Sequence, residues 1–333
     1  MSKVATDEIV IVDLNENGWL IDASSGRIVP TEVVARKLDR MILLGPDVTD
    51  IFVFVHGWRN NRQRASEGGE RLACILRTQF AAHGPMYRRL NRFRALFIVI
   101  RWPSMSNPFP SGYRQIRERA HDMTNRGHAH FVIAQLLGYL NSIRELPAAA
   151  PNILRTRKGQ YLHCIGHSFG GRFLCEAIMK AAEPKAPTLE WPWAHNEYPY
   201  TVDDLLVFQM ASRPADFGGR YSRLLTAAPI RGPVVLTFSR ADRALTLWHR
   251  FAEGTAGLGA RGATAPQDAI QQVRLPKLGE QLIIRPERGR IVNVDSTWRF
   301  KHGRFSRLEG AHSDIWYPES ANLILALVDQ ARP

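Results

Sequence analysis

Short apolar runs that alternate with longer segments constrain this chain more than any other feature of its sequence. The runs are rich in β-branched and aromatic residues, as in strands that are buried on both faces of a sheet. The segments between them are long enough for crossover helices, so the alternation predicts an α/β fold with a mostly parallel central sheet and helices on both faces. The predicted strands are 51–55, 96–102, 161–165, 205–210, 234–238 and 291–294.

The chain is predicted to open with an N-terminal β-hairpin. Residues 9–14 and 19–22 alternate in polarity around Asn17-Gly18, a dipeptide typical of a type I′ turn. With this hairpin the sheet has about eight strands, and we expect residues 1–333 to form one domain. The predicted crossover and terminal helices are 65–82, 129–146, 172–182 and 321–331.

Two segments, 103–128 and 184–204, are predicted as cap or pocket-lining insertions. Each contains a stretch rich in proline or aromatic residues, 103–113 and 184–200, which we expect to be irregular. Both segments would lie beyond the carboxyl ends of strands, where open α/β sheets bind ligands.

Length and composition indicate a globular protein. Hydrophobic residues make up 45% of the 333 residues and charged residues 23%, near the ordinary averages. No apolar run approaches the roughly 18 residues that cross a bilayer, and no secretory leader is recognised, so a cytoplasmic location is predicted. Cys74, Cys164 and Cys175 lack metal-ligand spacing and are predicted to be buried free thiols.

The chain carries a large excess of positive charge, with 44 Lys and Arg against 31 Asp and Glu, a formal +13. Between Arg59 and Arg126 there are fourteen arginines and four acidic residues, a net charge of +10. This basic region is either a solvated face or a binding surface for an anionic substrate or membrane. No zinc-finger or RNP-like signature accompanies the charge, so no nucleic-acid partner is expected.

A nucleophile motif follows the predicted strand 161–165. Gly166-His167-Ser168-Phe169-Gly170 is a G-x-S-x-G sequence between a strand and a helix, the context in which a serine sits on a strained turn with its hydroxyl exposed above the sheet. Glycines two residues before and after Ser168 keep Cβ atoms out of this crowded turn. We therefore predict Ser168 as a nucleophile.

A serine nucleophile needs a histidine base and a carboxylate that orients it. Asp242 lies in the loop after strand 234–238 and is the favoured acid; Asp216, after the preceding strand, is the alternative. His312 lies between the last predicted strand and the final helix and is the favoured base. His302 is the second choice, and His249 is expected on a helix face.

The oxyanion that forms during acyl transfer needs backbone donors. His56-Gly57-Trp58 follows the early strand 51–55. We predict that the N–H groups of Phe169 and Trp58 form the oxyanion hole, with Gly57 letting the chain turn.

Five motifs in order resemble the α/β-hydrolase superfamily, and within it a bacterial group of esterase- or lipase-like proteins catalogued as a domain of unknown function. The match covers roughly residues 50 to 320, and it departs from the group in Gly170-Gly171 and in the Trp- and Pro-rich segment near 190–200. The motifs are His56-Gly57-Trp58, Trp102-Pro103-Ser104, Gly166-His167-Ser168-Phe169-Gly170, Ser239-Arg240-Ala241-Asp242-Arg243-Ala244-Leu245 and Gly310-Ala311-His312-Ser313.

The residues and the resemblance imply the same activity. A Ser168–His312–Asp242 triad would hydrolyse a carboxylic ester through an acyl-enzyme, with no metal and no organic cofactor. The substrate is expected to be a small-molecule or lipid ester. The alternatives are a lipase or phospholipase acting at an anionic lipid surface, and a non-catalytic binding protein on a hydrolase fold.

Overall fold

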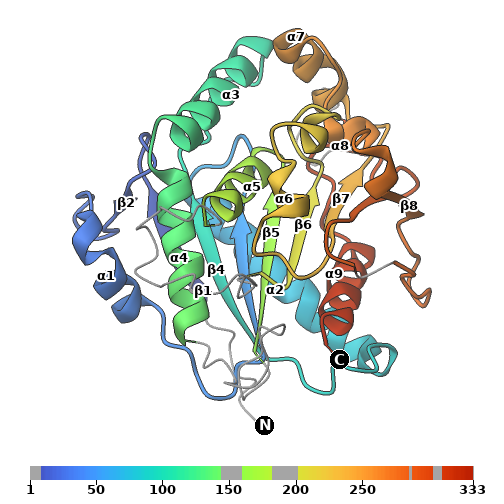
Figure 1. Ribbon diagram of the computed structural model, residues 1–333, viewed down its shortest axis with the longest axis horizontal. Helices are drawn as coiled ribbons and strands as arrows, with labels where there is room; N and C mark the ends of the chain where they lie inside the picture. Colours follow the sequence, from blue (N-terminus) through green and yellow to red (C-terminus); the bar gives the residue numbers. More distant parts are fainter. Residues whose placement is uncertain (1–8, 144–159, 182–201, 285–286, 303–309, 333) are drawn as a thin grey trace.

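The computed structural model describes residues 9–143, 160–181, 202–284, 287–302 and 310–332, and its centre is a nine-stranded sheet (Figure 1). The strand order is β2-β1-β4-β3-β5-β6-β7-β9-β8, and every neighbouring pair is parallel except β1 and β2. The predicted mostly parallel sheet and N-terminal hairpin are confirmed, with nine strands in place of about eight. The strands are β1 (Ile9–Leu14), β2 (Leu20–Ile21), β3 (Asp50–Val55), β4 (Ala95–Arg101), β5 (Tyr161–His167), β6 (Asp204–Phe208), β7 (Val234–Phe238), β8 (Ile270–Arg274) and β9 (Ile291–Asp295).

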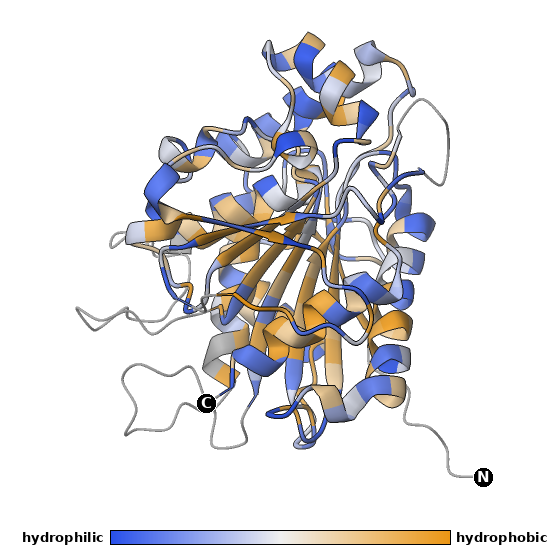
Figure 2. Ribbon diagram, turned by 90° about the vertical axis from the view of Figure 1, so that its right-hand side faces the viewer, coloured by the Kyte–Doolittle hydropathy of each residue, from blue (hydrophilic) through white to orange (hydrophobic). Residues whose placement is uncertain are grey.

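Helices cover both faces of this sheet. On one face α4 packs against α1 and α5, and on the other α2 packs against α9, so that the apolar strands lie between helical layers (Figure 2). Within the described residues, no helix has the length and apolarity that a membrane crossing requires. The architecture is an α/β-hydrolase-like fold. The helices are α1 (Val34–Met41), α2 (Arg62–His83), α3 (Pro110–Asn125), α4 (Ala129–Ile143), α5 (Phe169–Ala181), α6 (Arg223–Thr226), α7 (His249–Glu253), α8 (Leu258–Arg261) and α9 (Pro318–Gln330).

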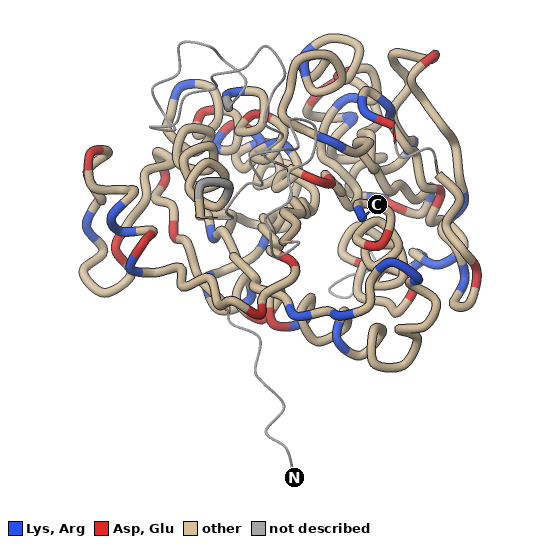
Figure 3. Tube along the Cα trace, turned by 60° about the horizontal axis from the view of Figure 1, so that its bottom comes forward, with Lys and Arg blue, Asp and Glu red and all other residues tan. Residues whose placement is uncertain are grey.

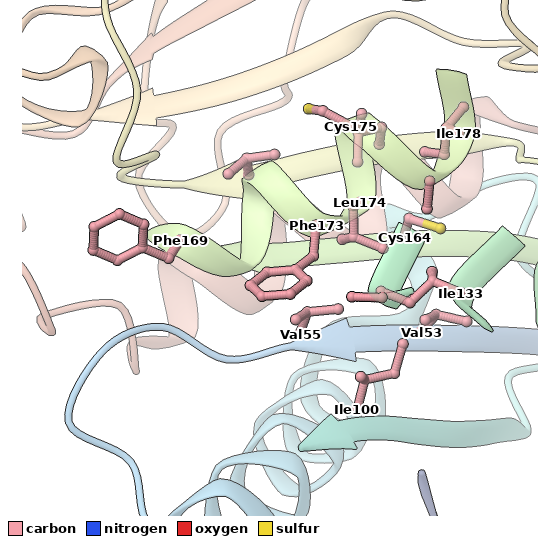
Figure 4. Close-up of a cluster of buried hydrophobic side chains, with 14 of the residues drawn as sticks. Val53, Val55, Ile100, Ile133, Cys164, Phe169, Phe173, Leu174, Cys175 and Ile178 are labelled. Atoms are coloured by element: carbon pink, nitrogen blue, oxygen red, sulfur yellow. The ribbon is translucent and has the colours of Figure 1, made fainter. Parts of the chain in front are cut away.

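The central strand β3 separates two hydrophobic cores. Val53 and Val55 belong to the core beneath α4 and α5, where they lie near Phe173 (Figure 4). Phe52 and Phe54 alternate with them and belong to the opposite core, which α2 and α9 cover. All six residues of β3 are buried, which explains why the strand reads as a continuous apolar run.

The sequence prediction missed β8 and α3. β8 reads Ile-Gln-Gln-Val-Arg at the edge of the sheet and is partly exposed, so it lacks the apolar run of a buried strand. The segment 103–113 is not irregular throughout, because α3 begins at Pro110; proline is accepted at the start of a helix, where its missing N–H has no intrahelical partner. Residues 184–201 of the second predicted insertion lie outside the described residues.

The prediction of three buried thiols is wrong at one position. Cys164 and Cys175 are buried, but Cys74 is exposed. Cys74 lies in α2, where Leu72 and Leu76 are buried. Leu72 and Leu76 lie on the buried side of the helix, whereas residue 74 between them faces solvent.

A buried charge network lies at the amino ends of the central strands. The ring nitrogens of His163 lie 3.0 Å from Asp50 Oδ1 and 2.9 Å from Asp204 Oδ2, and both Asp50 oxygens accept from Arg332, at 2.9 and 2.8 Å. Burial alone would lower the pKa of His163, but the hydrogen bonds to Asp204 and Asp50 outweigh it and raise the pKa to about 9. The network therefore joins β3, β5 and β6 to the C-terminal segment around a charged imidazole.

The raised pKa of His163 predicts a loss of stability at alkaline pH. Because the folded state holds this proton more tightly than the unfolded state, the contribution is complete below about pH 6.5 and disappears as the pH rises through about 9. We expect the free energy of unfolding to fall by on the order of 2 kcal/mol between pH 6.5 and 9.5. Urea unfolding across this range measures it, with His163→Gln as the control that lacks the titrating group; equal slopes in the two proteins would contradict the assignment.

Candidate active site

Ser168 occupies a strained turn between β5 and α5. Its φ is +56°, in the left-handed region that residues with a side chain rarely adopt. The turn is held by two hydrogen bonds, from Ser168 N–H to Phe208 O at 2.9 Å and from Gly171 N–H to Ser168 O at 3.2 Å. Such strain persists only where the surroundings over-determine the conformation, and it is the backbone geometry that the G-x-S-x-G sequence predicts.

The glycines of the motif are required by close backbone contacts. A Cβ on Gly170 would lie 2.0 Å from Val55 O, and one on Gly166 would lie 2.7 Å from Gly171 Cα. These atoms are backbone and cannot move aside as a flexible side chain could. Strand β3, the turn and α5 therefore approach each other more closely than residues with side chains would allow.

Ser168, His312 and Asp242 form one chain of hydrogen bonds. His312 Nε2 lies 2.8 Å from Ser168 Oγ, and His312 Nδ1 lies 2.8 Å from Asp242 Oδ2. Asp242 follows β7, and His312 follows β9 and precedes α9. All three residues are buried. The structure thus brings together the three residues that the sequence predicts for the triad.

Gln209 is a residue of this site that the sequence reasoning missed. Its side-chain nitrogen donates to Asp242 Oδ2 at 3.1 Å and to Ala311 O at 2.9 Å, so one amide holds both the carboxylate and the residue before His312. Gln209 is fully buried and its φ is +45°. The only sequence signal is its position immediately after β6, at the same edge of the sheet as Ser168.

The alternative acid and bases lie elsewhere. Asp216, at the start of the 3₁₀ turn η4 (Asp216–Gly218), accepts hydrogen bonds from Ser212 Oγ and from the N–H of Arg213. His302 is exposed, and His249 is the first residue of α7, with its Nδ1 2.8 Å from Thr255 O. None of the three belongs to the hydrogen-bonded chain of Ser168.

The predicted oxyanion loop lies against the serine. A Cβ on Gly57 would be 2.8 Å from Ser168 Cβ, so only glycine fits between the loop and the turn. Phe169 is the first residue of α5, and the N–H at that position has no partner within the helix. Trp58, the residue after Gly57, is buried, and its indole N–H donates to Ser106 Oγ at 2.7 Å.

The segment after β4 holds the oxyanion loop in place. Trp102 donates from its indole to His56 O at 2.8 Å and from its backbone to His56 Nε2 at 3.2 Å. Ser104 O accepts from Arg59 N–H at 3.0 Å, and Ser104 Oγ accepts from Asn60 N–H at 3.1 Å. The motifs at 56–58 and 102–104 therefore act as one structural unit, which explains why both occur in the chain.

Two histidines beside the site are held neutral. Burial lowers the pKa of His56 to about 4. Burial and the nearby His312 lower the pKa of His167 to about 3, and His167 Nε2 donates to His312 O at 2.8 Å. A neutral His167 fixes the backbone of His312 without placing a second charge next to its ring.

A cavity of about 80 Å³ opens beside His312. Phe54 and Trp316 contribute apolar lining, and His167 and Trp58 also line the cavity. The other lining residues come from the loop before α2 (His56, Arg59 and Asn60), from α2 (Arg64, Glu67, Gly68 and Arg71) and from Ser313. His312, whose Nε2 lies 2.8 Å from Ser168 Oγ, is among the lining residues.

No protein-family model matches this chain, and no curated protein matches it by sequence. Among solved structures, the phospholipase PlaB from Legionella pneumophila, in complex with thio-NAD, is similar over 59% of this chain with 14% sequence identity and a TM-score of 0.27. The matched part spans 39% of that phospholipase chain.

Proposed function

We propose that this protein is a serine hydrolase that cleaves carboxylic esters through an acyl-enzyme intermediate. Ser168 is the nucleophile, His312 is the general base and acid, and Asp242 orients the imidazole. The observation that carries the proposal is the continuous hydrogen-bonded chain from Asp242 through His312 to Ser168 Oγ, with the serine on a strained turn. A hydroxyl becomes an effective nucleophile when a positioned base takes its proton.

The first half of the proposed reaction acylates the enzyme. His312 Nε2 takes the proton of Ser168 as Oγ attacks the ester carbonyl, and the carbonyl oxygen becomes an oxyanion. The N–H groups of Phe169 and Trp58 stabilise that oxyanion. The protonated His312 then gives its proton to the departing alcohol.

The second half regenerates the serine. His312 takes a proton from a water molecule, which attacks the acyl carbonyl and releases the acid as the proton returns to Ser168. Asp242 holds the tautomer in which His312 Nδ1 carries a proton, and stabilises the imidazolium in both halves. Gln209 is a positioning residue, because its hydrogen bonds to Asp242 and Ala311 O fix the carboxylate relative to the histidine loop.

Hydrolysis of p-nitrophenyl acetate tests the proposal. An ester is the proposed substrate because its alcohol leaves with little assistance. The purified chain is expected to release a burst of p-nitrophenol equal to the enzyme concentration, followed by steady turnover, because deacylation is expected to be slower than acylation for this activated ester. The absence of both burst and turnover from folded protein would refute it.

Hydrolysis of lipid esters at an anionic surface is a second candidate function, favoured by one exposed patch. Phe109 at the start of α3 is 61% exposed, and Leu247 and Phe251, one helical turn apart, are 49% and 71% exposed. α3 and α7 meet near the carboxyl ends of the strands (Figure 1). Arg114 and Arg250 are exposed on the same two helices, and apolar side chains beside cations suit an anionic bilayer surface.

The second candidate predicts that Phe251→Ser weakens activity on vesicles. Removing one inserted aromatic side chain is expected to lower hydrolysis of anionic phospholipid vesicles roughly tenfold and to leave a soluble ester unchanged. Ile283→Ser, at a residue that is 80% exposed elsewhere, is the matched control. If both variants match the wild type on vesicles, the lipid-surface candidate is wrong.

A further inference from the structure

The basic region divides into arginines with different environments. Arg92 and Arg94 form ion pairs with Asp47, and Arg101 forms a well-buried pair with Asp13. Basic and acidic positions are interspersed over the trace (Figure 3). The environment of the arginines therefore differs from one part of the basic region to another.

Three other arginines of this region line the cavity beside His312. They are Arg59, Arg64 and Arg71, and Glu67 is the one acidic side chain among the described lining residues. Residues 64, 67 and 71 follow helical spacing, so one face of α2 is turned toward the cavity. Among the described lining residues the arginines and the glutamate sum to +2, and His56 and His167, whose pKa values are lowered, add no charge at neutral pH.

The start of α2 adds to this positive potential. The helix begins at Arg62, directly after Asn61, whose side chain accepts from Arg64 N–H at 2.8 Å. Its first turn contains no acidic residue and two arginines, although the N-terminus of a helix favours negative charge. The two arginines therefore lie at the end of the helix where positive charge is unfavourable. Of the two, Arg64 lines the cavity.

Contacts at the cavity orient the side chain of Arg71 and fix the backbone of Arg59. The guanidinium of Arg71 lies over the Trp316 ring, 5.2 Å from its centroid, and this stacking sets the orientation of the guanidinium plane. Arg59 has a φ of +61°, and its N–H donates to Ser104 O. A pre-organised cation loses less entropy on binding than a mobile one.

We propose that this cavity is the subsite for an anionic group, a carboxylate or phosphate, that the ester substrate carries close to its scissile bond. The inference rests on the proposed ester hydrolysis and names its substrate class. His312 lines the cavity and its Nε2 lies 2.8 Å from Ser168 Oγ, so the cavity adjoins the proposed site of acyl transfer. Its volume of about 80 Å³ holds a short acidic group, and the source is either a soluble acidic ester or the headgroup of an anionic lipid.

The soluble arm compares p-nitrophenyl hemisuccinate with p-nitrophenyl butyrate, which has a similar acyl length and no charge. We expect kcat/KM of the wild type to be at least roughly tenfold higher for the hemisuccinate, because one charge-assisted hydrogen bond to the carboxylate contributes about that much. Arg64→Gln and Arg71→Gln should each remove most of that preference, measured as the ratio of kcat/KM between the two esters. Arg77→Gln, on the same helix and outside the cavity lining, is the control for charge alone.

The lipid arm uses vesicles of phosphatidic acid or phosphatidylcholine with the same variants. A preference for phosphatidic acid that Arg64→Gln abolishes supports the subsite and assigns it to a lipid headgroup. Equal activity on charged and neutral substrates in both arms overturns the subsite while ester hydrolysis stands. A wild type that hydrolyses no ester overturns the proposed function and the subsite together.

Discussion

Ser168→Ala is expected to lower kcat for an activated ester by about 10⁶-fold. Removing the nucleophile of a serine triad removes the covalent route, and only the weaker catalysis by the oxyanion donors remains. The substitution removes one oxygen, and alanine keeps the Cβ that already occupies the strained position at φ +56°. The fold is therefore expected to persist, which circular dichroism and the Tm of the variant can verify.

Ser212→Ala is the matched control for this substitution. Ser212 is also fully buried, but its hydroxyl donates to Asp216 and not to a histidine. We expect this variant to retain activity within about threefold of the wild type. If Ser168→Ala retained wild-type turnover, Ser168 would not be the nucleophile.

Asp242→Asn is expected to lower kcat by about 10⁴-fold with little change in KM. Asparagine keeps the shape of the side chain, but its amide favours the wrong tautomer of His312 and cannot stabilise the imidazolium. The oxygen concerned is Asp242 Oδ2, 2.8 Å from His312 Nδ1. Initial rates over a range of ester concentrations separate the effect on kcat from any effect on KM.

Asp216→Asn decides between the two acids that the sequence left open. Asp216 accepts from Ser212 Oγ and Arg213 N–H, so its substitution is expected to affect stability more than turnover. A large loss of kcat in Asp216→Asn together with normal activity in Asp242→Asn would reverse the assignment.

Most of the sheet could be predicted because buried parallel strands leave a continuous apolar signature. Strand β3 is buried at every residue, and its sequence contains the apolar run 51–55 that such burial predicts. β8 could not be found in this way, because an edge strand with two glutamines has neither an apolar run nor strict alternation. α3 was missed because the prolines before it indicate irregular chain, although Pro110 is its first residue.

The candidate site was predictable where its members occupy fixed places in the chain order. Ser168, Asp242 and His312 follow three different strands, and a parallel sheet brings the carboxyl ends of its strands to one edge. Gln209 could not be predicted, because its role depends on a contact with Ala311, which is 102 residues away in sequence. The choice between Asp242 and Asp216 likewise depended on side-chain directions that spacing alone does not give.

Mapping of a fluorophosphonate adduct tests the central claim most directly. A fluorophosphonate reacts with a serine that a positioned histidine activates, so we expect one adduct per chain, on the peptide that contains Ser168, found by mass spectrometry after digestion. His312→Ala, which keeps Ser168 and removes its base, should label at least about 10³-fold more slowly. A folded wild-type chain that stays unlabelled, or that is labelled at another serine, would contradict the account.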